Sequence, residues 1–381
     1  MDKIDEILNQ GVENVIPSKE RLKEILLSGK KLNIYLGIDP TATKIHLGHA
    51  VQLRRLQSFA DLGHKVTFLI GDFTALIGDT SDKDKERPVL SSEQIQENFK
   101  TYKKQAEKIL DFSKIDVKFN SQWLEKLNLK DLIKLTQHFS FGDFASRELI
   151  KNRLQSGKKV GLHEALYPVL QGYDSYFMDT DIQIGGTDQT FNMQAGRTLQ
   201  KDLREKESFV ITTSFLMGTD GRKMSKSEGN AIWLEDSPEE MYGKIMSIKD
   251  ELIHSYFILA TSLPLAEVEK IEKEDPLYQK TKLAETIVNE LHNKDEAQKA
   301  KENFKKIFQE KKREFIPIHN LGTLQEVVAP YTSLATISDA KRLIYQGGVD
   351  LNGQTIKDPK HQLSVGDELI IGKRTFIKIE K

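Results

Sequence analysis

Two histidines, His46 and His49, lie three residues apart around Gly48 in the segment YLGIDPTATKIHLGH, just after an apparent β-strand. A metal site would need a third ligand at a diagnostic spacing, and the sequence offers none. A helix that begins here would instead present backbone N–H groups and the positive end of its dipole to a phosphate. The imidazoles would add donors, and Gly48 would let a flat base approach the backbone. The segment therefore predicts a nucleotide site without a Walker or GxGxxG loop.

A second segment, LMGTDGRKMSKSEGN, places Lys223 and Lys226 in a loop rich in glycine and serine. Such a loop is by default only a solvated surface, yet its two ammonium groups could also close over a polyphosphate. The pair HLGH and KMSKS, in this order and far apart in the chain, resembles the signature of class I aminoacyl-tRNA synthetases. That resemblance favours the nucleotide site over the surface loop.

These segments need strands and helices that bring them together. Strands separated by helices imply βαβ units and a parallel sheet, whose ligands bind at the carboxyl ends of the strands. A helix from about Leu47 to Leu62, ended by Gly63, fits this pattern, and two short amphipathic helices are expected to open the chain. The fold class is therefore α/β with a Rossmann-like parallel sheet, whose strands are predicted at residues 33–38, 65–70, 116–120, 181–184 and 209–213.

The pattern of expected secondary structure changes twice along the chain. Ser237, Pro238 and Glu240 carry the pattern of a helix start, and helical sequence then dominates. The basic run near its end is more often a solvated helix face than an RNA contact. The sequence therefore predicts three parts at residues 1–234, 235–320 and 321–381: an α/β part with N-terminal helices, an α-helical domain, and a small α+β domain. The resemblance implies that these are a class I catalytic domain, an anticodon-recognition domain and an RNA-binding domain. A helical insertion at about 88–161 lies within the first and could carry an oligomer interface.

Composition narrows the class of protein. A chain of 381 residues is longer than a single hydrophobic core usually supports, so more than one domain is expected. Its 56 basic and 57 acidic residues nearly cancel, so the protein has no overall positive potential that would attract nucleic acid. The absence of cysteine excludes a disulfide framework and thiolate metal ligands. The first thirty residues show neither a signal-peptide core nor a membrane-spanning run. The sequence predicts a soluble, cytoplasmic protein with no membrane partner.

Within class I the chain resembles the bacterial tyrosyl-tRNA synthetases that keep KMSKS, over nearly its whole length. The segments that carry this are YLGIDPTATKIHLGH, LIGDTSDKDKER, YPVLQGYDSY and QIGGTDQ. The resemblance implies activation of L-tyrosine with ATP and Mg²⁺, without a protein-bound metal, and transfer to tRNA(Tyr). It also implies a homodimer.

The resemblance further implies which residues bind tyrosine. Tyr35 and Asp174 are expected to hydrogen-bond the phenolic hydroxyl of the substrate. The ammonium group is expected to contact Asp79, Tyr167 and Gln171, and the wall near the carboxylate to include Gln183 and Gln189. Tyr167, Gln171 and Asp174 are spaced for one helix face, which is also how a core face looks. A core face rarely combines glutamine with aspartate, so the pocket interpretation is favoured.

A second implied set binds ATP and stabilises the charge that grows on the leaving pyrophosphate. The residues assigned to catalysis are Thr41, His46, His49, Lys83, Arg87, Lys223 and Lys226. Those assigned to the nucleotide or the adenylate are Gly37, Asp39, His46, Gly48, His49, Gly185, Asp188, Met224 and Lys226.

The C-terminal stretch TISDAKRLIYQGGVDLNGQTI resembles a small RNA-binding module shared by a ribosomal protein, some pseudouridine synthases and bacterial tyrosyl enzymes. A helix that starts at Ser338 and exposes Lys341 and Arg342, ahead of a turn with Gly347 and Gly348, suits contact with an RNA backbone.

Two departures and three alternatives remain. Leu47 stands where many members have isoleucine, and Thr190-Phe191 where many have tryptophan and glycine, which puts the neighbouring pocket wall in doubt. A tryptophanyl enzyme shares both signatures, but an indole offers one donor and no hydroxyl to Tyr35 and Asp174. A small-molecule nucleotidyltransferase should lack the C-terminal domains. A non-catalytic RNA-binding paralogue should have lost KMSKS or the pocket acids.

Overall fold

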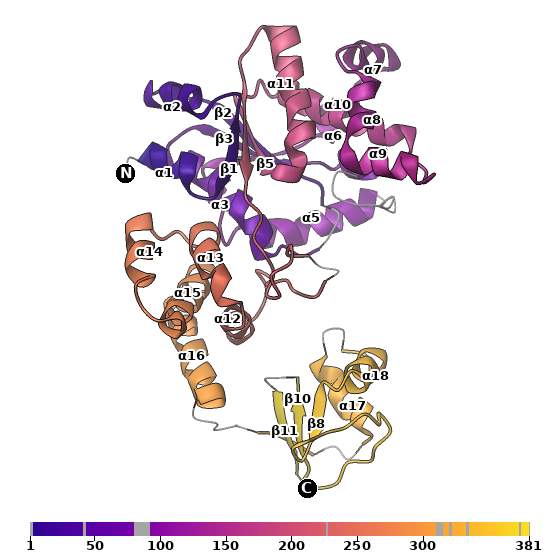
Figure 1. Ribbon diagram of the computed structural model, residues 1–381. Helices are drawn as coiled ribbons and strands as arrows, with labels where there is room; N and C mark the ends of the chain where they lie inside the picture. The colour runs from indigo at the N-terminus through magenta and orange to yellow at the C-terminus, as the bar shows by residue number, and fades with distance from the viewer. Residues whose placement is uncertain are drawn as a thin grey trace. The chain divides into compact units, whose positions relative to one another are not determined.

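The computed structural model describes residues 3–40, 43–79, 92–225, 228–309, 315–319, 322–332, 335–372 and 375–380 (Figure 1). Within it the chain forms two compact units, residues 1–298 and residues 299–381. Each has its own sheet, and each is described by itself.

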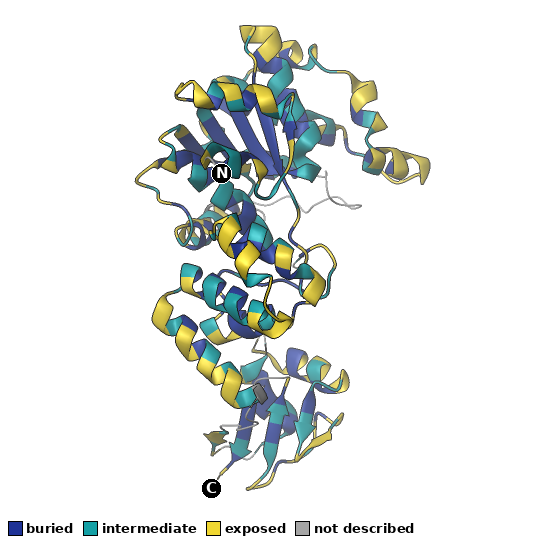
Figure 2. Ribbon diagram, turned by 60° about the vertical axis from the view of Figure 1, so that its left-hand side comes forward, coloured by how far each residue is buried: buried dark blue, intermediate teal, exposed yellow. Residues whose placement is uncertain are grey.

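A six-stranded sheet forms the centre of the first unit, in the order β1-β6-β5-β2-β3-β4. All neighbours are parallel except β1, which runs antiparallel to β6. The strands are largely buried between helices with exposed outer faces (Figure 2). The α/β class with a parallel sheet is confirmed. The bounds are β1 Val12–Ile16, β2 Asn33–Ile38, β3 Lys65–Ile70, β4 Ile115–Phe119, β5 Ile182–Gly186 and β6 Phe209–Thr213.

Strand β1 was not expected from the sequence, which predicts only two helices before β2. Both helices are present, but β1 lies between them and pairs with β6 through contacts such as Val15 with Ile211. Glu13 and Asn14 are exposed, so this edge strand lacks the apolar run that marks the central strands. Its partner lies far along the chain, and no local pattern shows it.

The helices of the α/β part pack around this sheet. Helix α3 packs on β2, β3 and β5, whereas α11 packs on β5 and β6 and lies beside α10 (Figure 1). Gly63 follows α3 with φ +74°, a conformation that favours glycine and ends the helix. The bounds are α1 Lys3–Asn9, α2 Lys19–Leu27, α3 Leu47–Asp61, α4 Thr74–Ile77, α5 Ser92–Ala106, α6 Ser121–Leu124, α7 Leu129–Thr136, α8 Phe141–Ser146, α9 Glu148–Gln155, α10 Leu162–Phe177, η1 Thr187–Gln189 and α11 Thr190–Arg204.

A helical region completes the first unit. Ser237 caps its first helix by accepting a hydrogen bond from the backbone N–H of Glu240, with Pro238 in the first turn, as the sequence predicts. Tyr242, Tyr256 and Phe257 form its fully buried centre. No helix in the described ranges is long and apolar enough to cross a bilayer. The bounds are α12 Pro238–Met246, η2 Asp250–Leu252, α13 Ile253–Ala260, α14 Leu265–Ile271, α15 Pro276–Leu291 and α16 Lys294–Phe304, which crosses into the second unit.

The described residues of the second unit form a five-stranded sheet, ordered β7-β11-β10-β8-β9, together with helices α17 and α18. Its core includes Leu324, Ile344, Leu369 and Ile377. The helix expected to start at Ser338 begins one residue earlier, because the Thr336 side chain accepts the cap bond from Asp339. The bounds are η3 Lys305–Gln309, β7 Ile316–Ile318, α17 Leu324–Val328, η4 Ala329–Tyr331, α18 Ile337–Tyr345, β8 Val349–Leu351, β9 Gln354–Thr355, β10 Glu368–Ile371 and β11 Thr375–Ile379.

Candidate active site

A cavity of about 240 Å³ opens at the carboxyl ends of β2, β3, β4 and β5. Ile38 ends β2, Gly71 follows β3, Asn120 follows β4, and Asp188 lies just after β5. This is where a parallel α/β sheet is expected to bind its ligands. The loops after the strands therefore form the cavity, as the sequence predicts.

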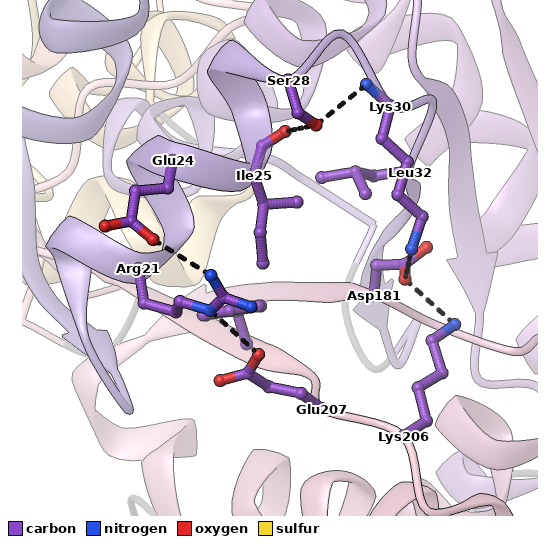
Figure 3. Close-up of a pocket in the computed structure, with 10 residues that line it drawn as sticks. Arg21, Glu24, Ile25, Ser28, Lys30, Leu32, Asp181, Lys206 and Glu207 are labelled. Atoms are coloured by element: carbon purple, nitrogen blue, oxygen red, sulfur yellow. Dashed lines mark hydrogen bonds and ion pairs between the residues drawn. The ribbon is translucent and has the colours of Figure 1, made fainter.

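A larger hollow of about 460 Å³ lies at the opposite, amino ends of the strands, where Asp181 precedes β5 (Figure 3). Its charges neutralise one another. The Arg21 guanidinium lies 3.4 Å from Glu207, and the ammonium groups of Lys206 and Lys30 lie 3.1 and 3.7 Å from Asp181. The Arg21 pair links α2 to the segment before β6, the other two pairs join loop residues before β2, β5 and β6, and the paired charges leave the hollow without an evident chemical role.

Most of the predicted site residues line the first cavity. They are Tyr35, Gly37, Asp39, His49, Asp79, Tyr167, Gln171, Asp174, Gln183, Gly185, Asp188 and Gln189. His46, Gly48, Lys223 and Met224 lie outside its lining but near it, as the contacts below show. Lys341 and Arg342 are exposed on α18 of the second unit. Four further residues, Thr41, Lys83, Arg87 and Lys226, lie outside the described residues.

Asp174 is the most deeply buried acid of the cavity, with 2% of its surface exposed. The indole N–H of Trp123 donates to one carboxyl oxygen at 2.7 Å, and the amide of Asn120 donates to the other at 3.1 Å. Burial raises the pKa of Asp174 to about 8, against the opposing effect of these two donors. The cavity thus holds an oriented carboxyl group that is easily protonated.

Tyr35 lies beside this acid, buried in strand β2. Burial, and then the charge of Asp174, raise the pKa of the Tyr35 phenol well above its usual value, so the hydroxyl keeps its proton. It donates to the amide oxygen of Gln183 at 3.1 Å. Gln183 lines the cavity and lies against Tyr35, because the two are opposite each other on paired strands. Its expected place near the substrate carboxylate stays a prediction.

Three polar side chains link Asp174 to the rest of the cavity. Besides its bond to Asp174, Asn120 donates to the hydroxyl of Thr74 at 3.0 Å. Thr74 donates to Asp39 at 2.8 Å, and Tyr167 donates to the other carboxyl oxygen of Asp39 at 2.9 Å. Both donors of the Asn120 amide are therefore used, and the carboxyl groups of Asp39 and Asp174 belong to one network.

Three side chains of this network, Thr74, Asn120 and Trp123, are not predicted from the sequence. Asn120 was included in a predicted strand, and its position at the carboxyl end of that strand was the available signal. Trp123 gave none, since its partner Asp174 lies 51 residues away. Such contacts become visible only when strands and helices are assembled.

Asp79 is a second acidic side chain that lines the cavity, and 8% of its surface is exposed. The amide of Gln189 donates to it at 2.6 Å, and that of Asn192 at 3.4 Å. Phe191, one of the two departures from the family pattern, does not line this cavity. Its ring lies under the guanidinium of Arg147 at 4.6 Å instead.

The two histidines meet at the start of α3. Their rings stack with centroids 3.8 Å apart, and the backbone N–H of His46 donates to Nδ1 of His49 at 3.3 Å. Burial, with further contributions from His49 and Lys223, lowers the pKa of His46 to about 2, so its imidazole is neutral. Its Nδ1 is buried without a hydrogen-bond partner among the described residues. A Cβ on Gly48 would lie 3.0 Å from the His46 ring, which explains the glycine.

The KMSKS segment approaches the cavity through Lys223. Its ammonium lies 3.3 Å from Asp188, which lines the cavity, and 4.0 Å above the ring of Phe215. Met224 is buried, with 3% of its surface exposed. The two signature segments therefore meet at the same edge of the sheet. No cluster of three His, Cys, Asp or Glu that could hold a metal occurs within the described ranges.

Comparison with known proteins agrees with this geometry. Residues 27–309 match the family described as tRNA synthetases class I (W and Y). The chain belongs to this family. Residues 324–369 of this class I synthetase also match the S4 domain.

Close relatives of this synthetase cover its full length. A protein named tyrosine–tRNA ligase 2 from Clostridium acetobutylicum is 44% identical and covers 100% of this chain and 99% of its own. A tyrosine–tRNA ligase from Thermotoga maritima is 40% identical over 98% of this chain and 96% of its own.

Solved structures share the fold of the synthetase. A C-terminally truncated mitochondrial tyrosyl-tRNA synthetase from Aspergillus nidulans has a TM-score of 0.68 at 25% identity, covering 80% of this chain and 94% of that one. A tyrosyl-tRNA synthetase from Archaeoglobus fulgidus, solved with L-tyrosine, has a TM-score of 0.61 at 22% identity, covering 78% and 98%.

Proposed function

We propose that the chain is a tyrosine–tRNA ligase. It activates L-tyrosine with ATP to tyrosyl-adenylate and pyrophosphate, and then transfers the tyrosyl group to the 3′-terminal adenosine of tRNA(Tyr). Full-length relatives of that name support this function. The observation that carries it is the buried pair of Tyr35 and Asp174 at one end of the cavity. A phenol can both donate to and accept from such a pair, whereas phenylalanine can form neither hydrogen bond with it.

The other cavity residues suit the backbone end of the amino acid. Asp79 supplies a carboxylate for the substrate ammonium, with Tyr167 and Gln171 of α10 on the same side of the cavity wall. Gln189 holds Asp79 and remains close to where the substrate carboxylate must reach ATP. The contact of Gln183 with Tyr35 supports a role for it at the phenol end.

Activation needs no protein nucleophile. The substrate carboxylate attacks the α-phosphorus of ATP. The bond between this phosphorus and the oxygen that bridges to the β-phosphorus breaks, and pyrophosphate leaves with the electron pair. The protein's part is to supply donors and cations where negative charge grows. The neutral His46, with a buried and unpaired Nδ1, and the Lys223 ammonium suit this part. Thr41, Lys83, Arg87 and Lys226 are assigned to it by family resemblance alone.

The nucleotide site uses backbone as well as side chains. Gly37 and Gly185 lie where β2 and β5 approach the cavity, and Asp39 and Asp188 face it from the loops that follow. Gly48 and Met224 belong to the two signature segments beside it. Mg²⁺ would bind the phosphate oxygens of ATP and neutralise part of their charge. Asp39 and Asp188 are assigned by family resemblance to the α-amino and ribose ends of the adenylate.

We further propose that the regions after residue 234 bind tRNA(Tyr). The helical region recognises the anticodon, and the S4 domain contacts the RNA backbone through Lys341 and Arg342, which are exposed on α18. Arg342 is also ion-paired with Asp339 in the same helix, so Lys341 is the stronger candidate for a phosphate contact. A cytoplasmic location, expected from the sequence, stays a prediction.

A homodimer is the third part of the proposal. Phe141, Leu162 and Leu129 are 64, 78 and 74% exposed, and the first two border an apolar hollow of about 430 Å³ between α8 and α10. A second copy that covers this face would remove the apolar surface from water. Leu162→Asp should shift the protein from dimer to monomer in sedimentation experiments. A wild-type monomer at micromolar concentration would contradict the assignment.

The charging reaction tests the proposed function. Purified protein, ATP and tRNA(Tyr) transcript should yield tyrosyl-tRNA with labelled tyrosine, whereas labelled tryptophan with tRNA(Trp) should yield none. Charging with tryptophan instead would support the alternative within the same family. Charging with neither would contradict the proposal.

A further inference from the structure

We propose that Asn230 is a positioning residue for the activation step. Its side chain fixes the backbone on both sides of Met224 and so sets where the Lys223 ammonium meets the nucleotide. This inference rests on the proposed function. It concerns a residue that lies after the KMSKS letters and does not line the cavity.

The contacts of Asn230 are those of a backbone partner. Its side-chain amide donates to the carbonyl of Lys223 at 3.2 Å, and its amide oxygen accepts from the backbone N–H of Ser225 at 3.0 Å. The same amide nitrogen donates to Asp220 at 2.8 Å. The Asn230 side chain is buried, with 3% of its surface exposed. It thus pairs with the backbone groups on either side of Met224, as the backbone of a neighbouring strand would.

The surrounding turn leaves this side chain little room. A Cβ on Gly218 would lie 2.4 Å from the Asn230 amide, so only glycine fits there. The backbone N–H of Gly218 donates to the carbonyl of Arg222 at 2.7 Å, and Met217 forms an antiparallel bridge with Lys223. The turn therefore closes around the Asn230 amide, which cannot change its hydrogen bonds without moving Lys223.

Lys223 connects the Asn230 turn to the proposed activation step. Its ammonium lies 3.3 Å from Asp188 and 4.0 Å above the Phe215 ring, at the edge of the cavity. Because catalysis depends on placement, a shift of about 1 Å in a catalytic cation costs up to about 100-fold in rate. The Asn230 amide prevents that shift by fixing the carbonyl of Lys223.

A simpler explanation is that Asn230 only stabilises the turn. Asn230→Asp separates the two roles because it preserves shape and keeps an acceptor for Ser225. It loses the donor to Lys223 and faces the Asp220 carboxylate. The matched control is Tyr256→Phe, which removes the 2.7 Å bond from the Tyr256 hydroxyl to the Met217 carbonyl at the base of the same turn. Both variants lose a partly buried hydrogen bond, but only the first loses one made directly to the backbone next to Met224.

The experiment measures tyrosine-dependent exchange of pyrophosphate into ATP, tyrosine affinity and Tm for each variant. Asn230→Asp should lower the kcat of exchange about tenfold or more, with tyrosine affinity unchanged. Tyr256→Phe should lower Tm comparably and leave kcat within about twofold. In a Lys223→Ala background, Asn230→Asp should cost little more, because the two act as one unit.

Three results would overturn the inference. Asn230→Asp could exchange at the wild-type rate, its effect could add fully to that of Lys223→Ala, or Tyr256→Phe could lose as much kcat at equal Tm. A wild-type protein that does not exchange at all would instead contradict the proposed function. The two failures are therefore distinguishable.

Discussion

At the scale of single residues, the protonation of Asp174 has a measurable consequence. Its pKa is about 8 in the folded protein and 3.8 in the unfolded chain. Between about pH 4 and pH 8 the folded state therefore holds a proton that the unfolded state has released, and the free energy of unfolding falls as the pH rises. The stability that this proton contributes is fully present below pH 3.8, the pKa in the unfolded chain, and is lost above about pH 8, the pKa in the folded protein.

Asp174→Asn should remove that dependence. Relative to the variant, the wild type should lose stability from pH 5 to pH 8, on the order of 1 kcal/mol per pH unit at most. Denaturant unfolding of both proteins at several pH values measures the difference. Parallel curves for the two proteins would show that Asp174 is ionised throughout.

Tyr35 and Asp174 also determine a second prediction, on substrate selectivity. The double variant Tyr35→Phe, Asp174→Asn should lose discrimination between tyrosine and phenylalanine by about 100-fold, because the phenol loses the Tyr35 hydroxyl and the Asp174 carboxyl group as partners. The ratio of kcat/KM values in pyrophosphate exchange measures this loss. The control is Tyr173→Phe, which removes a hydroxyl next to Asp174 in the sequence but outside the cavity. Unaltered selectivity in the double variant would rule out the assigned phenol contacts.

At the scale of elements, the close packing of α10 against α11 holds the substrate face in place. A Cβ on Gly172 of α10 would lie 3.1 Å from the backbone carbonyl of Ala195 in α11. Gly172→Ala should therefore separate the helices and cost about 1–3 kcal/mol of stability despite the better helix propensity of alanine. Thermal unfolding measures this cost. Gly142→Ala, at an exposed position of α8, is the control and should lose no stability. Equal Tm values for the two variants would refute the packing argument.

The same scale shows what could be predicted from the sequence. Strands β2, β3 and β6 were predicted at their observed bounds, because buried parallel strands are apolar runs. Tyr167, Gln171 and Asp174 were predicted to share a face because helix periodicity is local, and all three line the cavity. Strand β1 and the contacts of Asn120 and Trp123 depend on partners far along the chain, so no local pattern could reveal them.

At the scale of the whole molecule, activation and RNA binding should be separable. The cavity residues proposed for activation belong to the first compact unit, whereas the S4 domain lies in the second. A chain truncated after residue 320 should therefore keep pyrophosphate exchange within about twofold and lose tRNA affinity by about tenfold or more, as expected when phosphate contacts are removed. Filter binding of tRNA(Tyr) beside the exchange assay measures both. Unchanged tRNA affinity would refute the role of the S4 domain.

Activation of tyrosine in the cavity can be measured as exchange of labelled pyrophosphate into ATP without tRNA, with tyrosine, tryptophan or phenylalanine as the amino acid. We expect exchange with tyrosine only, which would establish the chemistry and the specificity together. Exchange with none of the three, from folded protein supplied with Mg²⁺, would contradict this assignment.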